Sequence, residues 1–229
     1  VKGFEKGMAE TRGWDEIEVP SAWNVAGIGK DGKCKYGIPV YVNQGGIFYH
    51  KVEVGDWRKG VMREPPKTWT TYKYRNEVGQ YVRSFNVPAN WKKRRVFINF
   101  DGVDSFFYLW INGKYVGFSK NSRSLAQFDI TKYLVKGANR VAVEVYRCSD
   151  GSFLETQDMF RMAGIIRSVY LTATPEIHVG DVVAIPDLDS HYINGALNVK
   201  LSVSNQSAKD AKRYSMHCSL YPVELYGDG

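Results

Sequence analysis

The run FFYLWINGKYVGF, from Phe106 to Phe118, constrains the fold more than any other segment. Two arms rich in aromatic and β-branched residues flank Asn112-Gly113, a pair that readily supplies positive φ at both centres of a type I′ turn. The first arm places Phe107, Leu109 and Ile111 on one face and Phe106, Tyr108 and Trp110 on the other. The segment therefore predicts a β-hairpin. We expect Tyr108 and Trp110 to belong to the core rather than to a sugar-stacking platform.

Short runs of the same kind recur along most of the chain. Val96–Phe100 is an apolar run suited to a buried strand, and residues 140–147 alternate between two faces. Between these runs, Asp129 is placed to cap a short helical turn. Many short strands divided by turns predict an all-β antiparallel sandwich rather than a parallel sheet.

A second β-pattern begins after Pro175. Residues 197–203 alternate strictly between apolar and polar side chains, and a further strand is predicted from Tyr214 to Leu220. An immunoglobulin-like sandwich needs about 100 residues, more than remain after Pro175. We therefore predict two domains, a sandwich at residues 1–175 and an incomplete immunoglobulin-like domain at residues 176–229.

The composition is that of an ordinary globular protein, with 44% hydrophobic and 24% charged residues. Part of the net charge of +7 comes from Lys92–Arg95, which we interpret as the solvated entry to a buried strand. We expect no nucleic-acid partner and no membrane partner, since no run approaches the roughly 20 apolar residues of a membrane span.

Cys148 and Cys218 lie in strand patterns and are expected in the core, and together with Cys34 they show no metal-binding spacing.

Residues 149–167, SDGSFLETQDMFRMAGIIR, form a long connection between two strand patterns and are called the acidic loop below. Loops of this length inside a compact domain are often functional. Asp150, Glu155 and Asp158 give this loop its acidic character, and its apolar residues argue against disorder. The pattern indicates an ordered binding surface for a polar, neutral ligand.

Several segments follow one another in an order that is characteristic of one family. They are FNVPANW at 85–91, FDGVDSFFYLWINGKYVGFSKNSR at 100–123, FDITKYL at 128–134, GANRVAVEVYR at 137–147 and SDGSFLETQDMFRMAGIIRSVYL at 149–171, with VPSAWN and PVYVN upstream. This order resembles the N-terminal domain of the large β-galactosidases of glycoside hydrolase family 2. The resemblance is densest from Tyr81 to Thr174 and only architectural after Pro175.

The resemblance implies a jelly-roll sandwich that is followed, in the complete enzyme, by an immunoglobulin-like domain and a catalytic (β/α)8 barrel. Such enzymes hydrolyse β-galactosides with retention, which requires two carboxyl groups about 5–5.5 Å apart. In the family both catalytic glutamates lie on the barrel. The resemblance therefore implies no catalytic residue in this chain, which we expect to be inactive alone.

The resemblance also implies two substrate-binding residues. Asp158, in QDMF, matches the aspartate that contacts galactose near its 6-hydroxyl and ligates a sodium ion shared with the barrel, and Asn43, in PVYVN, matches an asparagine that reaches the same pocket. Carboxylate and amide groups suit hydroxyl ligands. Asp150, Glu155 and Arg161 are expected to support the loop. We expect sodium only in the complete enzyme and no tightly bound cofactor in this chain.

The chain departs from the family pattern at several positions. Cys148, Thr156 and Phe160 replace bulkier or acidic residues around the loop motif. Lys120 stands where some relatives have an amide beside a structural magnesium ion, which puts that site in doubt because an ammonium cannot ligate a cation. Gly55–Gln80 is interpreted as an insertion.

Two other functions stay open from the sequence. If the chain does not contribute to an active site, it is either a stand-alone carbohydrate-binding module or a structural domain for subunit assembly. As part of a galactosidase, its partners would be a β-galactoside or oligosaccharide substrate, the barrel of the same polypeptide and further copies in a homo-oligomer. Basic glycan-degrading relatives favour a periplasmic or secreted location.

Overall fold

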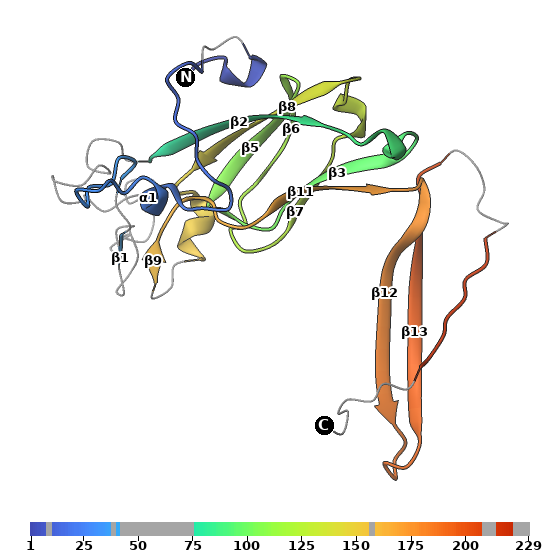
Figure 1. The fold of residues 1–229 in the computed structure, drawn as a ribbon. Helices are drawn as coiled ribbons and strands as arrows, with labels where there is room; N and C mark the ends of the chain where they lie inside the picture. The colour runs from blue at the N-terminus through green and yellow to red at the C-terminus, as the bar shows by residue number, and fades with distance from the viewer. Residues whose placement is uncertain (8–10, 38–39, 42–75, 156–158, 208–213, 222–229) are drawn as a thin grey trace, which may run out of the picture. The chain divides into compact units, whose positions relative to one another are not determined.

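The computed structural model describes residues 1–7, 11–37, 40–41, 76–155, 159–207 and 214–221 (Figure 1). The chain divides into two compact units, Val1–Ala173 and Thr174–Gly229. The strands of the first unit are β1 (Val40–Tyr41), β2 (Val78–Asn86), β3 (Arg95–Phe100), β4 (Val103–Asp104), β5 (Phe106–Ile111), β6 (Lys114–Ser119), β7 (Ala126–Asp129), β8 (Ala138–Tyr146), β9 (Phe160–Arg161), β10 (Gly164–Ile165) and β11 (Val169–Thr174). Its short helices are η1 (Phe4–Lys6), α1 (Trp23–Ala26), η2 (Ala89–Trp91), η3 (Thr131–Tyr133) and η4 (Asp150–Phe153).

In the described residues of the first unit, two larger sheets are accompanied by the two-stranded pairs β1-β9 and β10-β4. One larger sheet has the strand order β2-β8-β5-β6, and the other has the order β11-β3-β7. The inward-facing side chains of β3, β5 and β8 build the core between them; they include Val96, Ile98, Phe100, Phe107, Leu109, Ile111, Val143 and Val145. The rings of Phe100 and Phe107 meet across the core at 4.8 Å between centroids. The predicted all-β sandwich is therefore confirmed.

The hairpin predicted at Asn112-Gly113 is confirmed. Strands β5 and β6 pair antiparallel, and the two turn residues have φ values of 50° and 76°. Both values lie in the left-handed region that a type I′ turn requires. The strand predicted at residues 96–100 is also present as β3, and Asp129 Oδ1 accepts a hydrogen bond from the Thr131 backbone N–H at 3.0 Å, beside η3.

The expectation that Tyr108 and Trp110 belong to the core is wrong. Both are only half-buried, and their rings lie on the face of the sheet opposite to the core residues of β5. They join an aromatic surface that also contains Phe106, Tyr115, Phe118 and Tyr146. Buried Phe4 covers one end of this surface, with its ring 5.8 Å from that of Trp110.

The second unit contains a long antiparallel hairpin of β12 (Ile177–Leu188) and β13 (Gly195–Asn205). Apolar residues oppose one another on one of its faces, in the pairs Val179–Val203, Val182–Leu201, Ala184–Val199 and Pro186–Leu197. The strand predicted from Tyr214 to Leu220 is wrong, because no strand is formed at residues 214–221. The immunoglobulin-like assignment stays a prediction.

Other sequence predictions have mixed outcomes. Cys148 is buried as expected, whereas Cys218 is exposed, and the expectation that it lies in the core is wrong. The end of the predicted insertion belongs to the sheet, because Val78–Gln80 begin β2, while residues 55–75 lie outside the described residues. No helix in the described part of the chain is long and apolar enough to span a membrane.

Candidate functional site

The acidic loop begins with a compact helical turn, η4. Ser149 and Ser152 form a capping box, in which each side chain accepts a hydrogen bond from the other residue's backbone N–H. The Ser152 hydroxyl also lies 3.2 Å from Ser105 Oγ, at the end of β4. The start of the loop is thereby fixed to the sandwich.

Glu155 connects the loop to the segment between β6 and β7. Its carboxylate accepts hydrogen bonds from the Ser122 backbone N–H at 2.8 Å and from the Ser122 hydroxyl at 2.5 Å. Arg161, on β9, donates from Nη1 to the Glu155 carbonyl oxygen at 2.8 Å. Asp150, Glu155 and Arg161, three of the residues predicted from the sequence, therefore lie around one cavity.

This cavity, the loop pocket, has a volume of about 670 Å³. Its walls are Asp104, Lys120, Asn121, Arg123, Asp150, Gly151, Leu154, Glu155, Met159 and Arg161. Burial raises the pKa of Asp104, although Arg123, 3.5 Å away, partly offsets that effect. The pocket combines carboxylates with guanidinium groups and an exposed Leu154, a mixture that suits a polar ligand beside an apolar contact.

Lys120 and Asp150 form an ion pair at the loop pocket, with Nζ 2.7 Å from Oδ2. This hydrogen bond holds the pKa of Asp150 below its usual range. Because an ammonium carries no lone pair for a cation and already contacts the carboxylate, Lys120 and Asp150 as they lie do not fit a magnesium site. Within the described residues, no group of three or more His, Cys, Asp or Glu side chains could hold a metal ion.

Asn43 and Asp158, the predicted substrate-binding residues, lie outside the described residues, and so does the proposed sodium site at Asp158. The described strands next to them are paired. Strand β1 runs antiparallel to β9, with Val40 opposite Arg161 and Tyr41 opposite Phe160. The fold therefore joins the PVYVN segment to the acidic loop, although more than a hundred residues separate them in the sequence.

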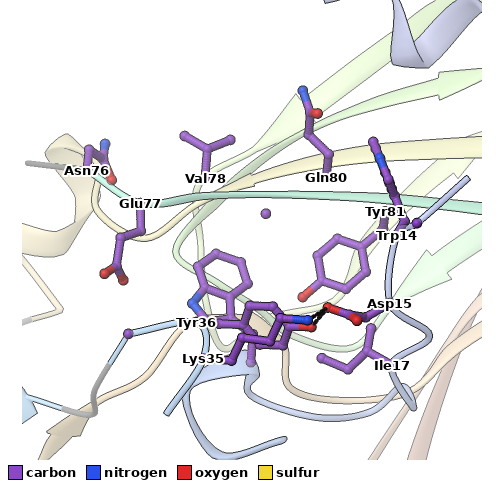
Figure 2. A pocket seen from close by; sticks show the side chains of 14 residues that line it. Trp14, Asp15, Ile17, Lys35, Tyr36, Asn76, Glu77, Val78, Gln80 and Tyr81 are labelled. Atoms are coloured by element: carbon purple, nitrogen blue, oxygen red, sulfur yellow. Dashed lines mark hydrogen bonds and ion pairs between the residues drawn. The ribbon is translucent and has the colours of Figure 1, made fainter. Parts of the chain in front are cut away.

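Sequence reasoning missed a second cavity, which we call the strand-edge pocket (Figure 2). It has a volume of about 620 Å³ and lies along β2, an outer strand of the four-stranded sheet. Four segments line it: residues 13–15 with Ile17, Trp23, residues 35–37 and residues 76–81. No local pattern in the sequence signals this pocket, because the segments that line it lie far apart along the chain.

Two charged side chains in the strand-edge pocket are paired with each other. Lys35 Nζ lies 2.6 Å from Asp15 Oδ2, and the Tyr36 hydroxyl donates to the same carboxylate oxygen (Figure 2). Deeper in the unit, Glu77 pairs with Arg147, whose side chain is 2% exposed. The charges around this pocket are thus balanced.

Comparison with known proteins places these features in a family. Residues 4–175 match the model for the sugar binding domain of glycosyl hydrolases family 2. The chain is 42% identical to a β-galactosidase of Priestia megaterium over 96% of its own length and 19% of that protein's. It is 36% identical to a β-galactosidase of Clostridium acetobutylicum over 93% of its length and 22% of that protein's. The chain thus spans about a fifth of the length of these relatives.

Solved structures show the same fold. A β-glycosidase from Bacteroides vulgatus superposes with a TM-score of 0.59 at 24% identity, over 91% of this chain and 23% of that one. A Bacteroides uniformis β-glucuronidase 2 variant gives a TM-score of 0.60 at 19% identity, over 90% of this chain and 21% of that one. These neighbours agree with the predicted jelly-roll sandwich. The chain belongs to glycoside hydrolase family 2, and residues 4–175 are a sugar-binding domain of that family.

Proposed function

We propose that this chain is the N-terminal part of a larger, retaining β-galactosidase and that it supplies contacts to galactose. The observation that carries the proposal is the 42% identity to a β-galactosidase over nearly the whole chain. The two catalytic glutamates of such an enzyme would lie on a barrel, outside this sequence. Hydrolysis would therefore require the remaining polypeptide.

Asn43 and Asp158 are the proposed galactose contacts. The pairing of the described strands β1 and β9 supports this proposal, because Tyr41 lies opposite Phe160 and each proposed contact is two residues from one of these in the sequence. The amide would donate to and accept from sugar hydroxyls, and the carboxylate would accept hydroxyl protons and bind a sodium ion.

The remainder of the loop would hold these contacts in place. Glu155 is bonded to Ser122, and Arg161 is bonded to the Glu155 carbonyl, so the segment on either side of Asp158 is tied to the sandwich. A rigid support of this kind reduces the entropy lost when a substrate binds. We assign Asp150, Glu155 and Arg161 to this supporting role.

A chimera tests the proposal. The chain would replace the corresponding segment of the Priestia megaterium β-galactosidase, and hydrolysis of a nitrophenyl β-galactoside would be measured. We expect the chimera to be active and the isolated chain to be inactive. Asp158→Asn should lower kcat/KM by roughly 100-fold, or about 2.7 kcal/mol of transition-state stabilisation. Asp181→Asn, at an exposed hairpin position, is the matched control and should retain full activity.

The same measurements separate the alternative functions. A chimera that folds but hydrolyses galactosides equally well with Asp158→Asn would contradict the assigned contact. Titration of galactose into the isolated chain, followed by NMR, should show very weak binding at the acidic loop that increases with sodium. Tight binding without sodium would instead indicate a stand-alone carbohydrate-binding module.

A further inference from the structure

We propose that the strand-edge pocket binds a neutral saccharide, independently of the galactose contacts assigned to Asn43 and Asp158. Among the described residues, the pocket shares no lining residue with the loop pocket. Its volume of about 620 Å³ falls in the range of roughly 300–1,000 Å³ that is typical of small-molecule sites.

The aromatic and aliphatic side chains that line the pocket include Trp14, Ile17, Tyr36, Val78 and Tyr81. Tyr36 and Tyr81 lie on the same side of β2, and Val78 points to the other side (Figure 2). Trp14, Tyr36 and Tyr81 are half-buried, so each ring keeps part of its surface in the pocket. The apolar C–H faces of a pyranose pack well on such rings, because aromatic side chains provide large, rigid contact areas.

Two glycines allow these rings to take their positions. A Cβ atom at Gly79 would lie 2.4 Å from the Trp23 indole, which is buried at the base of the pocket, and a Cβ at Gly27 would lie 2.4 Å from the Tyr36 ring. Either side chain would force an aromatic ring to move. The shape of the pocket therefore depends on the absence of side chains at both positions.

The charge balance of the pocket selects against an ionic ligand. The Asp15 carboxylate is paired with the Lys35 ammonium at 2.6 Å, and Glu77 is paired with Arg147. An anion or a cation would have to displace one of these partners, which costs free energy, whereas a neutral ligand leaves both pairs intact. Because Asp15 and Lys35 stay 45% and 63% exposed, they can also bond to ligand hydroxyls at the rim.

A wholly apolar ligand is also disfavoured. Gln80, whose side chain bonds to Glu144 and to the chain's N-terminal residue, adds an amide to the wall. Amide, carboxylate and ammonium groups around aromatic faces match the alternating hydroxyls and C–H faces of a sugar.

Lactose titration into the isotope-labelled full chain tests the proposal. The indole N–H signals of Trp14 and Trp23 and the backbone signals of Val78–Tyr81 should shift together, at millimolar lactose. Glucuronate, which carries a negative charge, should cause much smaller shifts than glucose, a neutral sugar of similar size. Trp14→Ala should weaken lactose binding about tenfold, since one stacking ring is lost.

Three further variants make the outcomes distinct. Asp15→Asn, at an exposed position that should not impair folding, is expected to weaken binding several-fold. Tyr115→Ala, which removes an exposed aromatic residue outside the pocket, should have no effect. Asp158→Asn and the removal of sodium should also leave this binding unchanged, even if the galactose assignment fails.

Shifts confined to the acidic loop would overturn the proposal. So would a lactose affinity that is the same in Trp14→Ala, in Asp15→Asn and in the unaltered chain. Loss of binding with Tyr115→Ala alone would place the saccharide on the aromatic sheet surface and would also overturn it. Shifts in the pocket that disappear with Trp14→Ala and persist with Asp158→Asn would support it.

Discussion

The Lys120 ammonium lies 2.7 Å from the Asp150 carboxylate at the rim of the loop pocket. Lys120 directly follows β6, and Asp150 begins η4, so this pair joins the hairpin to the acidic loop. The arrangement supplies the positive charge from a side chain rather than from a metal ion. Asp150 also accepts a hydrogen bond from the Gly151 backbone N–H at 2.9 Å, which holds the carboxylate in place.

Metal ions should therefore have little influence on the stability of this chain. Adding Mg²⁺ or EDTA is expected to leave its melting temperature unchanged, as measured by circular dichroism. The matched variant is Lys120→Gln, which replaces the ammonium by an amide and leaves the Asp150 carboxylate without its ion pair. Any stabilisation by Mg²⁺ is expected in this variant only. Clear stabilisation of the unaltered chain by Mg²⁺ would show that the lysine does not exclude the cation.

The buried pair of Arg147 and Glu77 should be important for stability. Their side chains are 2% and 11% exposed, and Arg147 also donates to the Arg161 carbonyl oxygen at 3.2 Å. Removing one charge of a buried pair is strongly destabilising, so Glu77→Gln should lower the free energy of unfolding by about 3–5 kcal/mol. Urea denaturation measures this loss.

An exposed ion pair provides the control for that experiment. Lys33 and Asp31 are 3.8 Å apart, with side chains 87% and 61% exposed. Solvent screens such pairs, so Lys33→Gln should change the free energy of unfolding by less than about 1 kcal/mol. Equal losses for Glu77→Gln and Lys33→Gln would mean that burial does not increase the contribution of the Arg147–Glu77 pair to the free energy of unfolding.

Asp129 should contribute a pH-dependent part of the stability. Burial tends to raise its pKa, but hydrogen bonds from the Thr131 hydroxyl and N–H, together with Arg95, lower it overall. A carboxyl group whose pKa is lowered by folding stabilises the folded state above its unfolded pKa of about 3.9. That contribution is lost as the pH falls through the lower pKa of the folded state.

Asp129→Asn tests this dependence. The variant should be less stable by roughly 1–3 kcal/mol at neutral pH, because hydrogen bonds to a charged acceptor are lost. The difference should shrink as the pH falls below about 4, where the unaltered chain loses the same charge. Denaturation midpoints measured across this range check the prediction, and a difference that is independent of pH would contradict it.

Gly79→Ala should destabilise the first unit. Its Cβ would meet the Trp23 indole at 2.4 Å, and Trp23 is only 6% exposed, so the ring has little room to move. Overpacking of this kind costs about 1–3 kcal/mol. Gly195→Ala is the control, since no atom lies within 4 Å of the added Cβ. Urea midpoints compare the two variants, and similar small changes would show that the indole adapts.

The sequence was most predictive where local patterns determine structure. Asn112-Gly113 specified the hairpin because few other residues tolerate positive φ at both turn positions. The alternation of Phe107 and Leu109 with their neighbours placed the core face correctly. The alternation could not show whether other parts of the chain cover the opposite face of β5. Tyr108 and Trp110, which lie on that face, were therefore wrongly assigned to the core. Alternation also failed at residues 214–220, where a strand pattern has no neighbouring strand to pair with in the described part of the chain.

The site was only partly accessible from the sequence for a similar reason. Asp150, Glu155 and Arg161 lie within one loop, so their proximity in the sequence predicted their proximity in space. The strand-edge pocket combines Asp15, Lys35 and β2, which only the tertiary fold brings together. Long-range convergence of this kind leaves no periodic signal, because each contributing segment is too short to have one.

The β12–β13 hairpin should be the least stable regular structure in the chain. Its paired Val182 and Leu201 belong to an apolar face on which Val182, Leu197, Val199 and Val203 are 57%, 46%, 44% and 53% exposed. An isolated two-stranded hairpin is marginally stable in water. Amide hydrogen exchange in β12 and β13 is therefore expected to be at least about 1,000-fold faster, relative to intrinsic rates, than in β5 and β8 of the core.

Extending the chain with the polypeptide that follows this segment in its β-galactosidase relatives should slow that exchange, because further strands would cover the apolar face. Equal protection of the hairpin and of the core in the chain alone would mean that the hairpin is stable by itself, and it would remove the physical reason for expecting an immunoglobulin-like domain there.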